Sequence, residues 1–197
     1  MGDSRGQPVR PMPGPSCNFC IGVVFVTMDA RKSPQVEISD YADVPRRAEE
    51  LGLPVPTGLA LLPRNFESAE SRDELHHEAL APTVRTLWRA AGVDETPLDG
   101  PGERFPRRHE KAFDQVLPII FVSTQLLQAD PKYLKLAIEV LVDWLKHHLS
   151  GLPRRPQVRA GFVLRKTQAE TFARVDYEGP VDGLKEIPDI LRGIADS

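Results

Sequence analysis

The chain has 197 residues, of which 41% are hydrophobic and 27% are charged, and its formal net charge at pH 7 is −3. This composition is typical of one soluble domain with a hydrophobic core, and no apolar run approaches the roughly 18 residues that a membrane helix needs. A general nucleic-acid binder carries a strong basic excess, so the charge balance argues against both a membrane and a nucleic acid as partner.

The N-terminal residues and the cysteines lead to two further expectations. Residues 1–16 contain four prolines and almost no aliphatic pattern. Such a segment buries too little apolar surface to offset its ordering entropy, which predicts a disordered leader before a single α/β domain over residues 17–197.

The chain has only two cysteines, and its first residues lack the apolar core of a signal peptide. We therefore expect a reducing, cytoplasmic environment.

The first third of the chain predicts four elements in order: a strand at 19–26, a short strand at 36–39, a short helix at 46–51 and a strand at 59–62. The first and last of these are continuously apolar, as strands covered on both faces are. Pro45 suits the first position of the short helix, and Gly52 suits the position just past its end.

The next region combines a helical pattern with a long loop. Apolar residues recur at helical spacing around Trp88, and Gly92 marks the end of that helix. Pro82 interrupts the stretch that starts at Ser71, so this region is either kinked or divided into two pieces. Residues 93–110 form a long polar loop, and a loop of that length inside a domain is usually functional or disordered.

The second half predicts, in order, a covered strand at 117–122, a helix at 131–149, an alternating hairpin at 158–164 and 173–177, and a helix at 181–194. Asp130 and Pro131 are a capping acid and a first-turn proline, and Pro188 indicates a bend or a late start in the last helix. Strands that alternate with helices favour a parallel sheet between helical layers. We expect a three-layer α/β domain with a mixed, largely parallel sheet that ends in an antiparallel hairpin and a C-terminal helix.

Polar residues follow the three covered strands and define the predicted site. In open α/β sheets, ligands bind beyond the carboxyl ends of parallel strands, which meet at one edge. The candidates at those ends are Asp29, Arg64, Asn65, Ser123 and Thr124. An acid, a guanidinium, an amide and two hydroxyls on one rim could hold a polar ligand or perform acid–base catalysis. The simpler alternative is that strand ends turn polar because they meet water.

Four residues are weak candidates for metal binding. Cys17 and Cys20 form a CxxC motif, but it precedes the first strand, and a structural zinc would need two further ligands. Glu74 and Glu78 would share one helical face with His77, which is half of a carboxylate di-metal site without its second copy. Free thiols and a solvated helix start are the simpler explanations, and we expect no bound metal or cofactor.

The functional prediction depends on absent motifs and on one apolar helix. The sequence contains no glycine-rich phosphate loop, nucleophile elbow or HExxH motif. The helix at 131–149 has only a narrow polar stripe, so either its own domain or a partner covers it. We expect a non-catalytic accessory or regulatory module that contacts a protein partner, or a second copy, through this helix. The alternative is a small enzyme, a hydrolase or a nucleotide-processing activity, at the strand ends.

Overall fold

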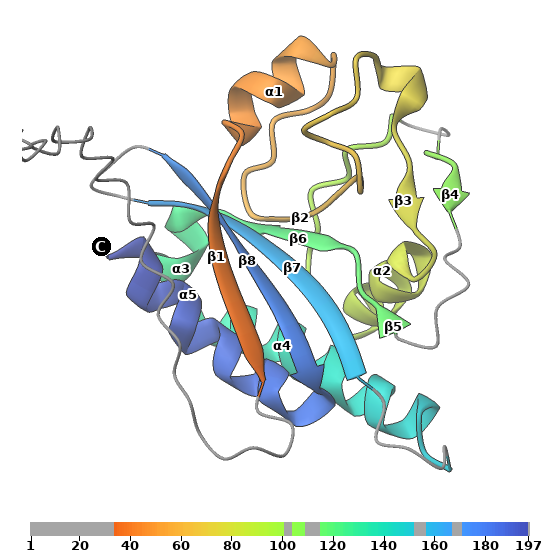
Figure 1. The fold of residues 1–197 in the computed structure, drawn as a ribbon, viewed down its shortest axis with the longest axis vertical. Coiled ribbons are helices and arrows are strands. Elements are labelled where there is room, and N and C mark those ends of the chain that lie inside the picture. Colours follow the sequence, from red (N-terminus) through yellow and green to blue (C-terminus); the bar gives the residue numbers. More distant parts are fainter. Residues whose placement is uncertain (1–33, 101–103, 109–114, 152–156, 167–170, 197) are drawn as a thin grey trace, which may run out of the picture.

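The computed structural model describes residues 34–100, 104–108, 115–151, 157–166 and 171–196. These residues form a mixed sheet with one layer of helices against one face and a smaller layer against the other (Figure 1). The predicted α/β class, with a mixed sheet and a C-terminal helix, is therefore confirmed. The predicted leader at 1–16 and the predicted strand at 19–26 lie outside the described residues.

In chain order, the helices and strands form an N-terminal and a C-terminal group. The first comprises β1 (Gln35–Tyr41), α1 (Val44–Glu50), β2 (Leu59–Leu62), the 3-10 helix η1 (Arg72–Glu74), β3 (His77–Glu78), α2 (Ala81–Ala90) and β4 (Arg107–Arg108). The second comprises β5 (Gln115–Val116), β6 (Ile119–Val122), α3 (Thr124–Ala129), α4 (Pro131–His148), β7 (Gln157–Arg165), β8 (Phe172–Pro180), the 3-10 helix η2 (Val181–Glu186) and α5 (Ile187–Ala195).

The main sheet has the order β1-β8-β7-β6-β2, and β5 pairs with β7 just before β6 does. Strand β7 runs parallel to β5 and β6, whereas the pairs β1–β8, β7–β8 and β2–β6 are antiparallel. The predicted closing hairpin is β7–β8. The sheet is less parallel than the alternation of elements suggested, because the chain enters β6 at the end of the sheet where it left β2, with Ile119 opposite Leu62.

One face of the sheet is covered by α2, α3, α4, α5 and η2. Because side chains alternate along a strand, every second residue of β7 and β8 points into this core, as Phe162 and Val175 do. Trp88 of α2 is 0% exposed, and its indole Nε1 donates a hydrogen bond of 3.0 Å to the carbonyl oxygen of Ala137 in α4. This bond ties α2 to the central helix.

Helix α4 is covered by its own domain. Its buried residues are Leu134, Ala137, Ile138, Leu141, Val142 and Leu145. The helix contacts α2, α3, α5 and η2, which explains why its polar stripe is narrow. Among its large apolar side chains, Leu136 is 40% exposed. The apolar surface that suggested a partner on residues 131–149 therefore lies largely inside this domain.

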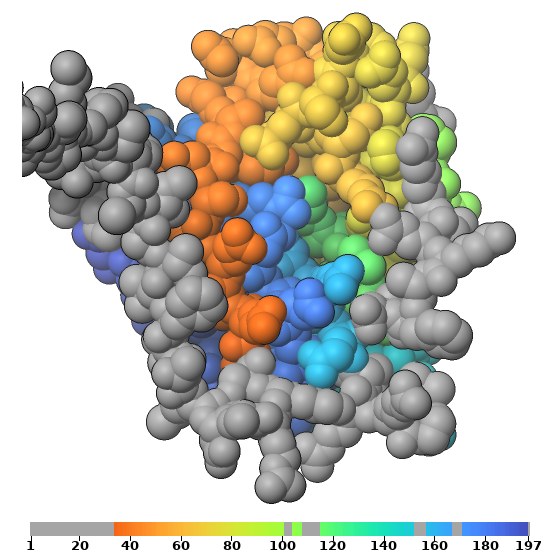
Figure 2. All heavy atoms as spheres, in the orientation of Figure 1, coloured from red at the N-terminus to blue at the C-terminus, as the bar shows by residue number. Residues whose placement is uncertain are grey.

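The opposite face of the sheet is covered over only a part of its area. A second core, with Val44, Phe66, Phe121 and Phe172 among its members, fills the space between the sheet, α1 and the segment after β2. Over β1, β8 and the first half of β7, the same face is hollowed and polar (Figure 2). Helical cover on one face and partial cover on the other leave this region open.

The stretch from Ser71 is divided into pieces, and the predicted helix is shorter than its periodicity allowed. Residues 75–78 are all buried, which suits an extended segment, and α2 begins only at Ala81 with Pro82 in its first turn. Gly92 follows with φ of 72°, a left-handed conformation that favours glycine. Pro188 gives the late start of α5, after η2.

Trp88 provides a test of this packing. Replacing a fully buried aromatic residue with alanine leaves a cavity, so Trp88→Ala is expected to lower the free energy of unfolding by about 3–5 kcal/mol. Urea denaturation of both chains measures the difference. Trp144→Ala is the matched control, because Trp144 is only half-buried and its loss should cost less. Equal losses would contradict the packing of α2 on α4.

Candidate functional site

The predicted strand-end rim is not formed. Strand β2 is antiparallel to β6, with Leu59 opposite Val122, so the residues that follow the two strands lie at opposite ends of the sheet. Arg64 and Asn65 are at one end, and Ser123 and Thr124 are at the other. Asp29 lies outside the described residues. The prediction of one shared rim is wrong because it assumed that these strands run in the same direction.

Ser123 and Thr124 make local structural contacts. The Ser123 hydroxyl caps α3 by accepting a hydrogen bond of 3.2 Å from the backbone N–H of Leu126. The Thr124 hydroxyl donates a hydrogen bond of 3.1 Å to the carbonyl oxygen of Arg165, at the end of β7. Both contacts satisfy groups at element ends, which explains these hydroxyls without a ligand.

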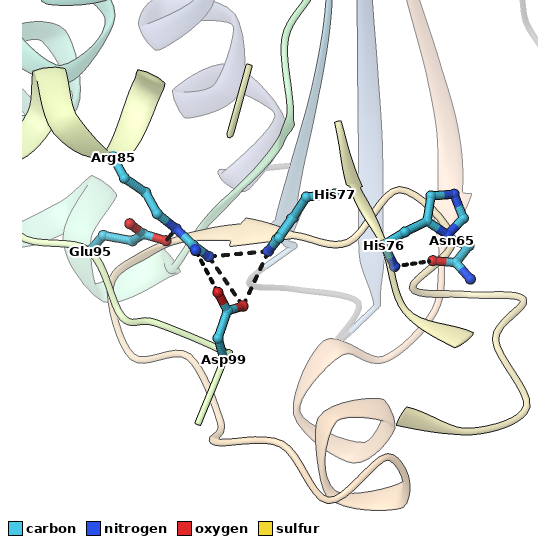
Figure 3. A network of polar contacts seen from close by, with 6 residues as sticks. All are labelled: Asn65, His76, His77, Arg85, Glu95 and Asp99. Atoms are coloured by element: carbon cyan, nitrogen blue, oxygen red, sulfur yellow. Dashed lines mark hydrogen bonds and ion pairs between the residues drawn. The ribbon is translucent and has the colours of Figure 1, made fainter. Parts of the chain in front are cut away.

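Asn65 and Arg64 differ in what they face. The side-chain amide of Asn65 donates to the carbonyl oxygen of Glu74 over 3.0 Å and accepts from the backbone N–H of His76 over 3.1 Å (Figure 3). Asn65 therefore joins the segment after β2 to the segment before β3. Arg64 lines the open hollow of the sheet, where its Nε lies 3.4 Å from Oε1 of Glu78.

The four weak metal candidates do not form a metal site in the described residues. Glu74 ends the 3-10 helix η1, while His77 and Glu78 form strand β3, so these residues do not share one helical face as predicted. Alternation along β3 sends neighbouring side chains to opposite sides. Across the described chain, no group of three or more metal-binding side chains is found, and Cys17 and Cys20 lie outside it.

His77 instead belongs to a buried charged network with Arg85, Glu95 and Asp99 (Figure 3). Nε2 of His77 lies 3.3 Å from Oδ1 of Asp99 and 3.1 Å from Nη2 of Arg85. Arg85 Nη1 donates to Oδ2 of Asp99 over 2.5 Å, and Arg85 Nε donates to Oε1 of Glu95 over 2.9 Å. One guanidinium therefore holds two carboxylates and an imidazole together.

The network shifts the pKa values of its carboxyl groups in opposite directions. Burial alone would raise the pKa of Asp99, but its contacts with His77 and Arg85 outweigh burial and lower that pKa from 3.8 to about 2. For Glu95, burial dominates over the attraction of Arg85, and the pKa is raised. Asp99 is therefore held firmly as a carboxylate, whereas Glu95 takes up a proton more readily than usual.

The network fixes the predicted long loop against the sheet. Glu95 and Asp99 lie on that loop, Arg85 on α2 and His77 on β3. The backbone N–H of Thr96 donates a hydrogen bond of 2.7 Å to the carbonyl oxygen of Leu59, on the outer edge of β2. The described part of this loop is therefore held in place and covers one edge of the sheet.

A pocket of about 870 Å³ lies between this loop and α2. Its lining includes Arg85, Glu95 and Asp99, together with the exposed Arg89 and Arg104. The guanidinium of Arg85 is already engaged by both carboxylates, which restricts what it can offer a ligand. The network therefore acts first as a structural clamp for the loop that forms one wall of the pocket.

His77 itself is poorly placed for catalysis. It is 2% exposed, and within the described part of the chain its Nδ1 atom is buried without a hydrogen-bond partner. Its ring lies 5.5 Å from that of Phe105, between ring centroids. A general base must reach the proton that it removes, so a histidine buried to this extent cannot serve an entering substrate without rearrangement.

The open part of the sheet face forms a second cavity, of about 520 Å³, which we call the sheet hollow. Its polar and charged lining residues are Gln35, Glu37, Arg64, Glu78, Arg159, Arg174, Asp176, Tyr177 and Glu178. The hollow lies between β1 and the segment after β2, above β7 and β8 (Figure 2). Its volume falls within the range of roughly 300–1,000 Å³ that is common for ligand sites.

Three arginine–carboxylate pairs surround the sheet hollow. One is the Arg64–Glu78 contact. In the second, Arg159 Nε lies 3.0 Å from Oε2 of Glu178 on the neighbouring strand. In the third, Arg174 Nε lies 2.8 Å from Oδ2 of Asp176. Charges of both signs therefore line the cavity.

Gly161 of β7 keeps the floor of the sheet hollow open. A Cβ atom at this position would lie 3.3 Å from Oδ1 of Asp176 and 3.6 Å from Nη2 of Arg174. Residues on either side along β7 carry side chains, and Gly161 sits opposite Asp176 in the register with β8. The missing side chain lets the charged groups of β8 lean over the strand.

Sequence reasoning missed most of both sites. Arg159 belongs to no recognisable motif, and its pairing with Glu178 could be found only by aligning β7 with β8. Glu95 and Asp99 were hidden in the polar loop, although its length did mark the region as functional or disordered. No signal in the sequence connected Asp99 to His77, which stands 22 residues earlier.

Comparison with known proteins gives no match: no family model, no curated protein and no solved structure matches this chain. The two cavities are therefore interpreted from their own chemistry. None of the helices in the described ranges is long and apolar enough to span a membrane.

Asp99 provides a test of the charged network. Asp99→Asn leaves the partly buried Arg85 short of a charged partner, so we expect the free energy of unfolding at pH 7 to fall by about 3 kcal/mol. Because the folded-state pKa is lowered, the stabilising effect of the carboxylate is complete above its ordinary pKa of 3.8 and is lost as the pH falls through about 2. Urea titrations at several pH values should show the two chains converging in acid.

The control for this experiment is Asp189→Asn. Asp189 forms an exposed pair with Arg192, its side chain is 82% exposed, and such pairs contribute little. A difference between wild type and Asp99→Asn that stays constant down to pH 2 would show that the carboxylate is not held ionised by the network.

Proposed function

We propose that this chain is a non-catalytic accessory or regulatory module that binds a polar segment of a partner protein in the sheet hollow. The observation that carries the proposal is the uncovered part of the sheet face, where three arginine–carboxylate pairs surround the floor at Gly161. The proposal includes a cytoplasmic location, which the low cysteine content supports. It also moves the partner contact from α4, whose apolar side chains are used inside the domain, to the sheet.

The lining of the sheet hollow favours binding over catalysis. Among the described residues, its lining comprises arginines, carboxylates, one glutamine, one tyrosine, one glycine and apolar side chains, without a serine, cysteine or histidine that could act as an activated nucleophile. The hydroxyl of Tyr177 is engaged, because it donates a hydrogen bond of 2.6 Å to the carbonyl oxygen of Pro180. Burial, followed by the charges of Glu186 and Asp182, raises the pKa of Tyr177 to about 12, which keeps the hydroxyl protonated.

The paired charges of the sheet hollow favour a ligand that carries both signs. A purely anionic ligand would face the carboxylates of Glu178 and Asp176, and a purely cationic one would face Arg159 and Arg174. Covering charges without giving them new partners costs free energy. A peptide segment with alternating basic and acidic side chains can pair with both members of each ion pair. We therefore take the ligand to be a segment of this composition.

Gly161 allows a direct test. Gly161→Leu fills the floor of the hollow, where a Cβ atom already contacts the ends of Asp176 and Arg174. Wild type should bind a synthetic peptide of alternating lysine and glutamate, and Gly161→Leu should bind it about tenfold more weakly or worse, by isothermal titration calorimetry. Peptides of the same length made only of lysine or only of glutamate should bind weakly to both chains.

The matched control is Gly193→Leu, because Gly193 lies in α5 with nothing within 4 Å of its would-be Cβ atom. This variant should bind the mixed peptide like wild type. Circular dichroism establishes that both variants are folded, and Arg159→Gln provides a second way to weaken binding without filling space. Failure of wild type to bind the mixed peptide, or full binding by Gly161→Leu, would contradict the proposal.

The second candidate function is a small enzyme that uses the pocket beside the charged network. The observation in its favour is that the pKa of Glu95 is raised while that of Asp99 is lowered, as in pairs of catalytic carboxyl groups. Its test is hydrolysis of a panel of activated esters, phosphate esters and nucleotides by wild type and by Glu95→Gln. We expect no turnover by either chain. Turnover by wild type that Glu95→Gln abolishes would establish the enzyme instead.

A further inference from the structure

The two edges of the main sheet differ in how the described residues cover them. The outer edge of β2 is covered by the loop after α2, through the bond from Thr96 to Leu59 and a bridge between Leu59 and Glu95. Strand β1 pairs with β8 on its inner side, and among the described residues no strand pairs with its outer side. Within the described residues, the backbone groups of β1 that point outward therefore have no strand as a partner.

Strand β1 carries few of the features that usually protect an edge, and Glu37 and Asp40 are its charged residues. Its sequence from Gln35 to Tyr41 contains no proline, lysine or arginine. All seven of its residues are in unbroken register with β8, from Gln35 opposite Glu178 to Tyr41 opposite Phe172, so no bulge interrupts it. Ile38, at its centre, is 49% exposed, the most exposed of the large apolar side chains in the described chain. A strand in unbroken register with an exposed isoleucine at its centre is suited to strand addition.

We propose that β1 pairs with β1 of a second copy of this chain, antiparallel and about a two-fold axis at Ile38. Ile38 is the middle residue of the strand, so this is the antiparallel register that pairs all seven residues. It sets Ile38 against the partner's Ile38, and Glu37 against the partner's Ser39. A two-fold interface of this kind is self-complementary and closed.

The distribution of charge on β1 supports this register over its neighbours. With the axis at Ile38, Asp40 faces the partner's Val36, and Gln35 faces the partner's Tyr41, so no two carboxylates are directly opposed. An axis at Glu37 would set two glutamates against each other, and an axis at Asp40 would set two aspartates against each other. Like charges directly opposite destabilise a strand pair, whereas paired β-branched side chains stabilise it.

A second copy placed in this way extends the sheet without closing the sheet hollow. The axis runs perpendicular to the sheet, so the helical layers of both copies lie on one side and both hollows lie on the other. Val36 and Ile38 belong to the helical side, where Val36 packs on the core. The pairing uses the backbone and these apolar side chains and does not depend on the function proposed for the hollow.

Light scattering coupled to size-exclusion chromatography tests the proposal on the full-length chain. Wild type should have the mass of a dimer, and Ile38→Lys should be a monomer, because it sets two ammonium groups against each other at the axis. The matched control is Leu136→Lys, which changes another exposed apolar residue, on α4, and should stay dimeric. A monomeric wild type, a dimeric Ile38→Lys, or loss of the dimer in Leu136→Lys would each overturn the proposal.

A cross-link locates the axis independently. In a chain with Cys17→Ser and Cys20→Ser, Ile38→Cys places one thiol from each copy at the two-fold axis, where mild oxidation should produce a disulfide-linked dimer on a non-reducing gel. Leu136→Cys in the same background should stay uncross-linked. Cross-linking through position 136 and not through position 38 would place the interface on α4 and overturn the assignment of β1.

Discussion

Strand β7 is the element on which the rest of this structure depends, because it lies at the centre of the sheet and pairs with β5, β6 and β8. Its alternating side chains serve two different surroundings. Val158, Ala160, Phe162 and Leu164 enter the helix-covered core, while on the other face Arg159 and Gly161 meet the hollow and Val163 enters the second core. A shift of one residue would place Arg159 in the core, so burial on the helical face sets the register that forms the hollow.

The charged network fixes the segment after α2 at the edge of the sheet. The segment after α2 returns along the edge of β2, and its backbone needs partners where water is excluded. Arg85 supplies a fixed point by binding Glu95 and Asp99, each on that segment, while His77 of β3 approaches from the other side. At Glu95 burial outweighs the attraction of Arg85 and raises the pKa, whereas at Asp99 the contacts with His77 and Arg85 outweigh burial and lower it.

Local signals in the sequence predicted most of the elements, whereas strand direction and long-range pairing were outside their reach. Pro45, and Asp130 with Pro131, mark helix starts that the structure confirms, and alternation predicted the β7–β8 hairpin. The strand-end rim was wrong because the direction of β6 beside β2 is decided by the path of some fifty intervening residues, which periodicity does not report. His77 was selected for a helical spacing that does not exist, and its actual partners are set by the fold.

The surfaces left for partners lie on one side of the molecule, and β1 contributes to both of them in perpendicular directions. Its side chains at Gln35 and Glu37 rise into the sheet hollow, while its outward backbone lies in the plane of the sheet. The β2 edge is covered by a loop that the charged network holds in place. Within the described residues, no comparable group of contacts covers the edge of β1. The pairing that we propose for β1 would cover its outer edge with a second copy, as the loop after α2 covers the edge of β2, and covered edges are protected from uncontrolled association.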